Sequence, residues 1–260
     1  MRRELRAFSA STRLWLRYMA VDRFMLFCAF VQPFFIAVTV MYMLHHQPQF
    51  DPVYVVVGSA LTGIWSVVLF DGSWAINSER FQGTLELLVG APSSLYAVIA
   101  GKLAGGMAFS VTSMALSYAV GAWLFGYSIV VRDVPAFAVA FVLALIAIGA
   151  LGVLIAPLGI LARSVRQFLT VLEHPIYILG GFLFPVLLLP GWLLPISYAL
   201  PPYWAAVALH GTSSGELSGV AFAEVCAVLL LSSLACFVLA APLFRLVLRR
   251  ARVEGTLSLT

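Results

Sequence analysis

Long runs of apolar residues, interrupted by short polar stretches, fill most of this chain. A helix that spans a membrane needs about 20 predominantly apolar residues, and six runs reach that length. They are Phe24 to Leu44, Val53 to Ile76, Leu103 to Phe125, Val134 to Leu161, Phe168 to Leu189 and Leu217 to Phe244. The pattern predicts an all-α polytopic membrane protein with six transmembrane helices in a single domain, residues 1–260.

The segment from Pro190 to His210 is also apolar, but it contains four prolines. Proline removes backbone donors and breaks helices, and backbone groups freed at membrane depth must be satisfied by protein or water. We therefore expect a re-entrant hairpin of two short helices before the last span. Its aromatic residues favour an interfacial belt over a substrate clamp. They are Trp192, Tyr198, Tyr203 and Trp204.

The first 22 residues separate into two faces on a helical wheel. One arc is largely apolar and holds Leu5, Phe8, Thr12, Trp15, Leu16 and Met19. The opposite arc is basic and holds Arg2, Arg3, Arg6, Arg13 and Arg17. This pattern predicts an amphipathic helix at the cytoplasmic membrane surface, with its basic face toward water or anionic lipid headgroups.

Composition and charge agree with a membrane protein and set its direction. The chain is 62% hydrophobic and 10% charged, whereas soluble domains are about 25% charged. The net charge is +4, but the basic residues flank apolar runs and form no aromatic-lined patch, so no nucleic-acid partner is expected. With both termini inside, 14 of the 15 Lys and Arg residues are cytoplasmic and only Arg132 is outside. The positive-inside rule then predicts six spans, N-in and C-in.

No metal site is expected from the sequence. The three cysteines are dispersed in apolar runs without metal-ligand spacing. His45 and His46 are adjacent, but no third ligand is close in sequence, and neighbouring side chains point in different directions.

A polar, glycine-containing loop, ERFQGTLELLVGAP, covers residues 79–92 between the second and third runs. Gly83 suits the end of one helix, and Thr84 to Val89 suits a short second helix that Pro92 closes. Phe81, Leu85 and Leu88 share one face at helical spacing. On the residues alone two interpretations stay open: a connector packed on the bilayer, or a knob that docks in a groove of another protein.

This loop, followed by Gly101-Lys102, resembles the signature E-R-x-x-G-T-L-E-x-L-x-x-x-P of type-2 ABC exporter permeases, with Ala91 as a mild departure. The amphipathic N-terminal helix, six spans and broken hairpin match that family's architecture. The resemblance implies a coupling helix that docks on a separate ATP-binding cassette ATPase subunit. The positions that would carry this role are Glu79, Arg80, Gly83, Thr84, Leu85, Glu86, Leu87 and Leu88.

The resemblance also implies a second permease subunit, identical or related, and a bacterial cytoplasmic (plasma) membrane location. The chain lacks a G-x-x-x-x-G-K-[ST] phosphate loop, so ATP and Mg²⁺ are expected on the partner and no cofactor on this chain. A hydrophobic drug, a lipid or a lipid-linked glycan is the expected cargo. The implied walls of the translocation path are Phe34, Phe35, Trp65, Tyr177 and Phe182.

Charged residues inside apolar runs are expensive in a membrane and need a reason. Glu173 and His174 are expected near the cytoplasmic end of the fifth span, with Arg163 and Arg166 as candidate partners. Glu224 is about two turns into the last span, where it suits either packing against the hairpin or an outer gate. Gly101 and Gly105 form a small-x-x-x-small pair that suits a close helix contact, including one between subunits.

Two other functional classes stay open on the sequence. A membrane-embedded lipid-modifying enzyme needs reactive side chains that converge at one depth, but His174 and His210 are expected on opposite sides of the membrane. A passive assembly or anchoring subunit would move no substrate with any partner.

Overall fold

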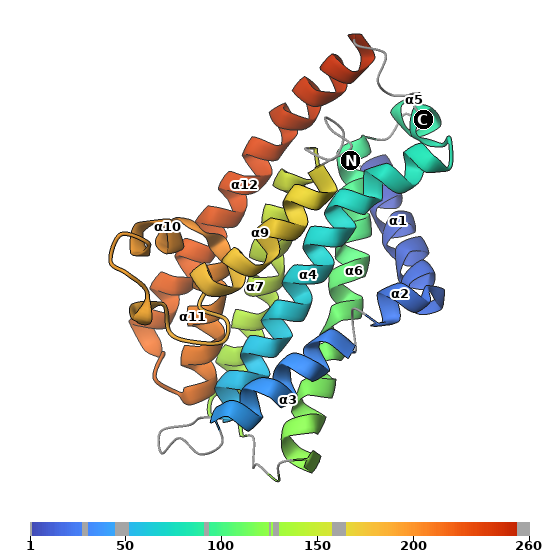
Figure 1. The fold of residues 1–260 in the computed structure, drawn as a ribbon. Helices are drawn as coiled ribbons and strands as arrows, with labels where there is room; N and C mark the ends of the chain where they lie inside the picture. Colours follow the sequence, from blue (N-terminus) through green and yellow to red (C-terminus); the bar gives the residue numbers. More distant parts are fainter. Residues whose placement is uncertain are drawn as a thin grey trace.

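A computed structural model describes residues 2–27, 31–44, 52–90, 94–124, 126, 130–157 and 165–253. These residues fold into a bundle of helices (Figure 1), and no strand is found among them. The α-helices are α1 (Arg2–Val21), α2 (Arg23–Leu26), α3 (Gln32–Leu44), α4 (Pro52–Phe81), α5 (Leu85–Gly90), α6 (Leu95–Ala119), α7 (Val134–Ile155), α9 (Val165–Leu179), α10 (Leu194–Ala199), α11 (Pro201–Ser214) and α12 (Gly219–Val253). The π-helix η2 (Val120–Leu124) and the 3₁₀ helix η3 (Val186–Leu188) complete the order.

Within this described part, four helices are long and apolar enough to cross a membrane. The qualifying stretches are Pro52–Phe70, Leu95–Leu124, Val134–Ile155 and Gly219–Leu246. The first predicted span, Phe24 to Leu44, contains α2 and α3, with residues 28–30 outside the described part, and α3 holds a shorter apolar stretch, Phe34–Met43. The chain is therefore a multi-pass membrane protein whose described part is all-helical.

The predicted fifth span, Phe168 to Leu189, is wrong as one continuous helix. Helix α9 ends at Leu179, and a turn follows in which Gly181 has a φ of +65°. Pro185 is extended, with φ −60° and ψ 132°. A left-handed glycine and an extended proline both end helices, so the apolar run continues as irregular backbone and η3 rather than as helix.

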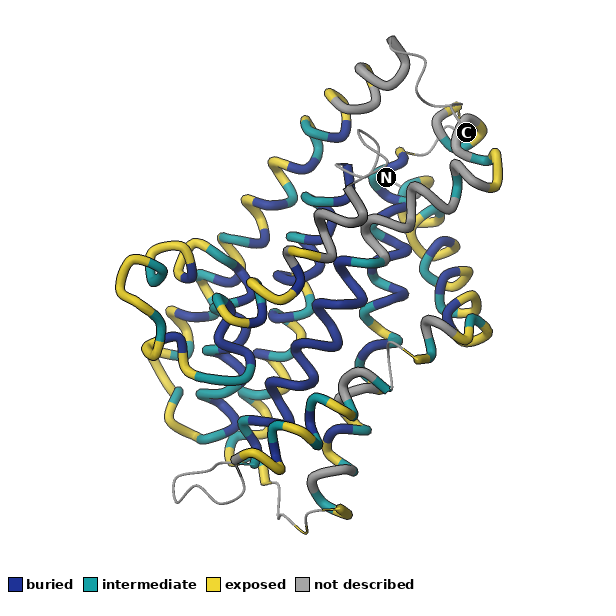
Figure 2. The backbone as a smooth tube through the Cα atoms, in the orientation of Figure 1, coloured by how far each residue is buried: buried dark blue, intermediate teal, exposed yellow. Residues whose placement is uncertain are grey.

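Helix α4 is the centre of the bundle, where Figure 2 shows a nearly continuous buried stretch. Its apolar stretch is 89% buried within the chain, against 28% for that of α12. Small residues let neighbouring helices approach closely. The buried hydroxyls of Ser59 and Thr62 donate to carbonyls of the same helix at 3.0 and 2.7 Å, which satisfies them without a partner helix.

The predicted pair of short helices in the proline-rich segment is confirmed as α10 and α11, joined by the extended residue Leu200. Helix α11 continues past His210 and ends at Ser214, where Gly215 has a φ of +77°. The His210 ring stacks on Tyr54 of α4 at 3.6 Å between centroids, and its Nε2 is 3.2 Å from the Phe182 carbonyl oxygen. These contacts fix the hairpin to α4 and to the turn after α9.

The N-terminal amphipathic helix is confirmed as α1, which lies along the first half of α6 (Figure 1). Arg3, Arg6, Arg13 and Arg17 are exposed, and Trp15 and Met19 of the apolar face are buried. Gly101 and Gly105 of α6 face α1 of the same chain. A Cβ at Gly101 would be 2.5 Å from the Phe8 carbonyl oxygen, and one at Gly105 would be 2.9 Å from that of Thr12. The glycine pair therefore serves a close contact within the chain.

Candidate functional site

The turn between α4 and α5 owes its shape to the order of residues from Glu79 to Thr84. Gly83 has a φ of +68°, a conformation that glycine adopts without a Cβ penalty. The Thr84 amide donates to the Glu79 carbonyl oxygen at 2.9 Å, which is the six-to-one bond of a Schellman C-cap. Thr84 then precedes α5, and its own carbonyl accepts from the Leu88 amide at 3.0 Å. Glutamate, glycine and threonine at this spacing thus end one helix and start the next.

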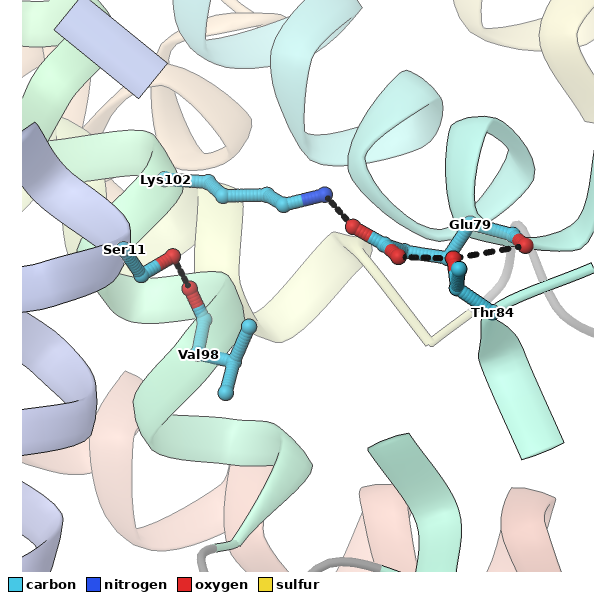
Figure 3. Close-up of polar contacts among 5 residues, drawn as sticks. All are labelled: Ser11, Glu79, Thr84, Val98 and Lys102. Carbon is cyan, nitrogen blue, oxygen red and sulfur yellow. Dashed lines mark hydrogen bonds and ion pairs between the residues drawn. The ribbon is translucent and has the colours of Figure 1, made fainter. Parts of the chain in front are cut away.

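The Glu79 side chain connects this turn to α6 (Figure 3). One carboxylate oxygen, Oε1, is 2.6 Å from Nζ of Lys102 on α6, and Oε2 accepts from the Thr84 hydroxyl. Burial raises the pKa of the Glu79 carboxyl, but hydrogen bonds from Lys102 and Thr84 and the positive charge of Lys102 outweigh it, so the pKa is below its ordinary value. Glu79 is accordingly an anion that binds Thr84 at the end of the turn and Lys102 on α6.

Lys102 also contacts α1, since its Nζ is 4.7 Å from the centroid of the Trp15 ring. The lysine side chain is 4% exposed, so it is a buried residue of α6, although the predicted third span begins only at Leu103. Its position among small and apolar residues, AVIAGKLAGG, is the signal that could have identified it, because a charge there requires a partner.

Two further bonds hold α1 against the start of α6. Ser11 donates to the Val98 carbonyl oxygen at 2.8 Å (Figure 3). The Glu4 carboxylate accepts from the Ser94 hydroxyl at 2.7 Å and from its amide at 3.2 Å. These hydrogen bonds lower the Glu4 pKa, and a carboxylate is favourable at this helix N-terminus. Sequence reasoning assigned no role to Ser11, Glu4 or Ser94.

The structure describes only some of the predicted coupling side chains. Leu87 is 74% exposed on α5 and points away from the chain's own core, whereas Leu88 is partly buried against that core. The side chains of Arg80, Leu85 and Glu86 fall outside the described part, as do residues 91–93. Helix α5 therefore packs through Leu88 and leaves Leu87 available to a partner.

The five predicted path residues fall into two groups. Phe34 and Phe35 of α3 are edge to face at 5.6 Å between centroids, and Phe35 is 60% exposed. Trp65, Tyr177 and Phe182 are buried within the chain, with Tyr177 and Phe182 rings 6.1 Å apart. Phe35 thus has a surface for lipid or another subunit, while the buried three lie between α4, α9 and the following turn.

A buried polar cluster joins α4 to α9 beside these aromatic residues. The Ser66 and Tyr177 hydroxyls donate to Oε1 of Glu173 at 2.6 and 2.5 Å. Arg163 and the side chain of Arg166, which the sequence suggested as partners of Glu173, are outside the described part. The partners that the structure shows for Glu173 are hydroxyls, which sequence reasoning missed because serine and tyrosine carry no charge to flag them.

Replacing Glu173 should test whether this cluster stabilises the fold. Glu173→Ala is expected to lower the free energy of unfolding by about 2–4 kcal/mol, because Ser66 and Tyr177 lose a buried acceptor and a cavity forms. Glu173→Gln keeps an amide oxygen and should lose about 1 kcal/mol. Thermal unfolding of the detergent-solubilised chain measures both, and equal losses in the two variants would contradict a role for hydrogen bonding.

Glu224, the predicted outer gate, lies in the second turn of α12 with an exposed side chain. His174 on α9 is also exposed, while His45 and His46 are outside the described part. No described hydrogen bond involves the Glu224 side chain, so its gating role stays a prediction.

Comparison with known proteins gives one family. A family model described as "ABC-2 type transporter" matches residues 7–212, which include most of α1, the turn at Gly83, α5, α6 and most of α11. A comparison with curated proteins gives no significant match.

Proposed function

We propose a function that rests on the family of this chain, which belongs to the ABC-2 type transporter family and is a permease component of an ABC transporter. In this proposal the chain couples ATP hydrolysis on a separate subunit to export. The cargo would be a hydrophobic or lipid-linked molecule. ATP and Mg²⁺ would be held by the ATPase subunit, and a second permease subunit, identical or related, would complete the transporter in a bacterial cytoplasmic membrane.

The proposal rests on two features of α5: its base, the turn that precedes Leu85, is held by contacts within the chain, and its Leu87 side chain is exposed. Leu87 is exposed on a helix of only six residues, a length that is marginal on its own. Its base is held by Glu79, which binds Thr84 in the turn and Lys102 on α6. A helix held in this way can transmit a displacement instead of absorbing it.

The expected path of the movement follows these contacts. Closure of the ATPase subunit would displace α5, and the Glu79–Lys102 ion pair would carry that displacement to α6. Because Nζ of Lys102 also contacts the Trp15 ring, α1 would move with α6. The membrane helices would then change their relative positions, as alternation between two arrangements requires.

Docking through α5 can be tested at the exposed Leu87. Leu87→Asp is expected to weaken binding of the co-purifying ATPase subunit by at least about tenfold, about 1.4 kcal/mol, because a charge replaces an apolar interface contact. Surface plasmon resonance with the permease in nanodiscs measures the dissociation constant.

Leu87→Met is the matched control and should bind as the unaltered chain does, because it keeps an apolar side chain of similar size. If the Asp variant binds the ATPase subunit as tightly as the Met variant, α5 is not the docking element.

A further inference from the structure

The contacts that hold the proline-rich hairpin on the bundle meet at one small junction. Tyr54 of α4 donates its hydroxyl to the Gly181 carbonyl oxygen at 3.1 Å. His210 of α11 stacks on the Tyr54 ring, and its Nε2 is 3.2 Å from the Phe182 carbonyl oxygen. A Cβ at Gly58 would clash with this same oxygen, so the turn after α9 lies directly against α4. These contacts of Tyr54 and His210, the Tyr54–His210 latch, join α4, the turn and α11.

The latch leaves one nitrogen of the His210 ring without a partner. Burial disfavours the charged ring. A backbone carbonyl only accepts hydrogen bonds, so Nε2 carries the ring hydrogen and Nδ1 keeps a lone pair. Nδ1 is buried, and the described part of the chain offers it no hydrogen-bond partner. The same is true of the Ser197 hydroxyl on α10. Unpartnered buried polar atoms cost free energy, so the hairpin carries two such costs in this arrangement.

Space for movement lies beside the latch. A cavity of about 210 Å³ is bordered by both latch rings, by the turn after α9 and by Tyr198 and Tyr203 of the hairpin. Gly180 and Gly181 follow the end of α9 directly, and glycine accepts a change of backbone angles more readily than other residues. If α11 moved away from α4, water would reach Nδ1 and supply the donor that this atom lacks. The junction can therefore exist closed and dry or open and hydrated.

We infer that the Tyr54–His210 latch opens during the transport cycle, so that α11 separates from α4 and from the turn after α9. The inference rests on the proposed function, because a coupled permease alternates between two arrangements of its helices. In the closed arrangement two hydrogen bonds and one ring contact hold the three elements together. Opening replaces these bonds with bonds to water and gives Nδ1 of His210 a partner.

Diethyl pyrocarbonate measures the opening directly, because it reacts with the ring nitrogen of a neutral histidine that carries the lone pair. In His210 this atom is Nδ1, which is buried while the latch is closed. The full chain is treated in nanodiscs at neutral pH, and the modification of each histidine is measured by mass spectrometry of its peptides. His174 is exposed and is the internal control, because its modification should not depend on the latch.

Tyr54→Phe is expected to raise the rate of His210 modification about fivefold, because the open arrangement gains population when the bond to the Gly181 carbonyl is lost. Tyr203→Phe is the matched control. Tyr203 borders the same cavity, but no described hydrogen bond involves its hydroxyl, so this variant should react as the unaltered chain does. Equal rates of His210 modification in the two variants would overturn the inference, whether or not an ATPase subunit is present.

The unaltered chain with its co-purifying ATPase subunit tests the opening during the cycle. ATP should raise the modification of His210 at least as far as Tyr54→Phe does, while that of His174 stays constant. Spin labels at the exposed positions Gln82 and Leu14 report separately whether ATP moves the coupling elements. A change in their distance without a change at His210 would overturn the inference. If ATP changes neither, the proposed coupling is contradicted, and the inference that rests on it is overturned as well.

Discussion

Replacing Lys102 with methionine is expected to disconnect α5 from the membrane helices. Methionine keeps most of the apolar stem but removes the charge that holds Glu79 at 2.6 Å. Loss of one member of a buried ion pair leaves the other uncompensated, typically at 3–5 kcal/mol. Glu79 keeps 18% exposure, so we expect a smaller loss, about 1–3 kcal/mol.

The functional consequence should exceed the loss of stability. Spin labels at the exposed positions Gln82, beside α5, and Leu14, on α1, report the distance between the two elements. In the intact complex this distance should change when ATP is bound, and in Lys102→Met the change should disappear while ATP hydrolysis continues. A full ATP-dependent change in the variant would rule out Lys102 as the connection.

A double-mutant cycle separates the pair from its surroundings. Lys102→Met, Glu79→Gln and the double variant should show a coupling energy of about 1–3 kcal/mol in thermal unfolding, because each single change removes the same ion pair. A coupling energy near zero would mean that Lys102 acts through its contact with Trp15 instead.

Replacing Gly101 with leucine is expected to force α1 away from α6. A Cβ there would be 2.5 Å from the Phe8 carbonyl oxygen and 2.9 Å from the Ser11 Cβ, and the first of these is backbone that cannot rotate aside. Overpacking typically costs about 1–3 kcal/mol. The Ser11–Val98 bond would also be lost, for about 1 kcal/mol more.

Thermal unfolding of the purified chain measures the destabilisation, and a disulfide between cysteines introduced in α1 and α6 reports the separation of the helices. Gly191→Leu is the matched control, because a Cβ at Gly191 meets nothing within 4 Å. If Gly101→Leu unfolds at the same temperature as Gly191→Leu and still forms the crosslink, the close contact between α1 and α6 is not needed for stability.

The local pattern of residues predicts the helices that can be identified one at a time. The amphipathic face of α1, the short helix after Gly83 and the division of the proline-rich segment into α10 and α11 all follow from spacing, glycine and proline. The end of α9 did not follow, since Gly180 and Gly181 lie inside an apolar run that hydropathy treats as continuous.

The sequence by itself determined that this chain is helical, that it belongs in a membrane and that, within residues 79–90, a turn at Gly83 separates the end of one helix from a second, short one. Those properties depend on local backbone preference and on hydropathy. Only the tertiary structure decided that Lys102 pairs with Glu79, that Gly101 receives α1, and that Glu173 binds two hydroxyls. Tyr177 is only four residues from Glu173 on α9, but the other partners are distant in sequence, and which of them meet depends on how whole helices pack against one another.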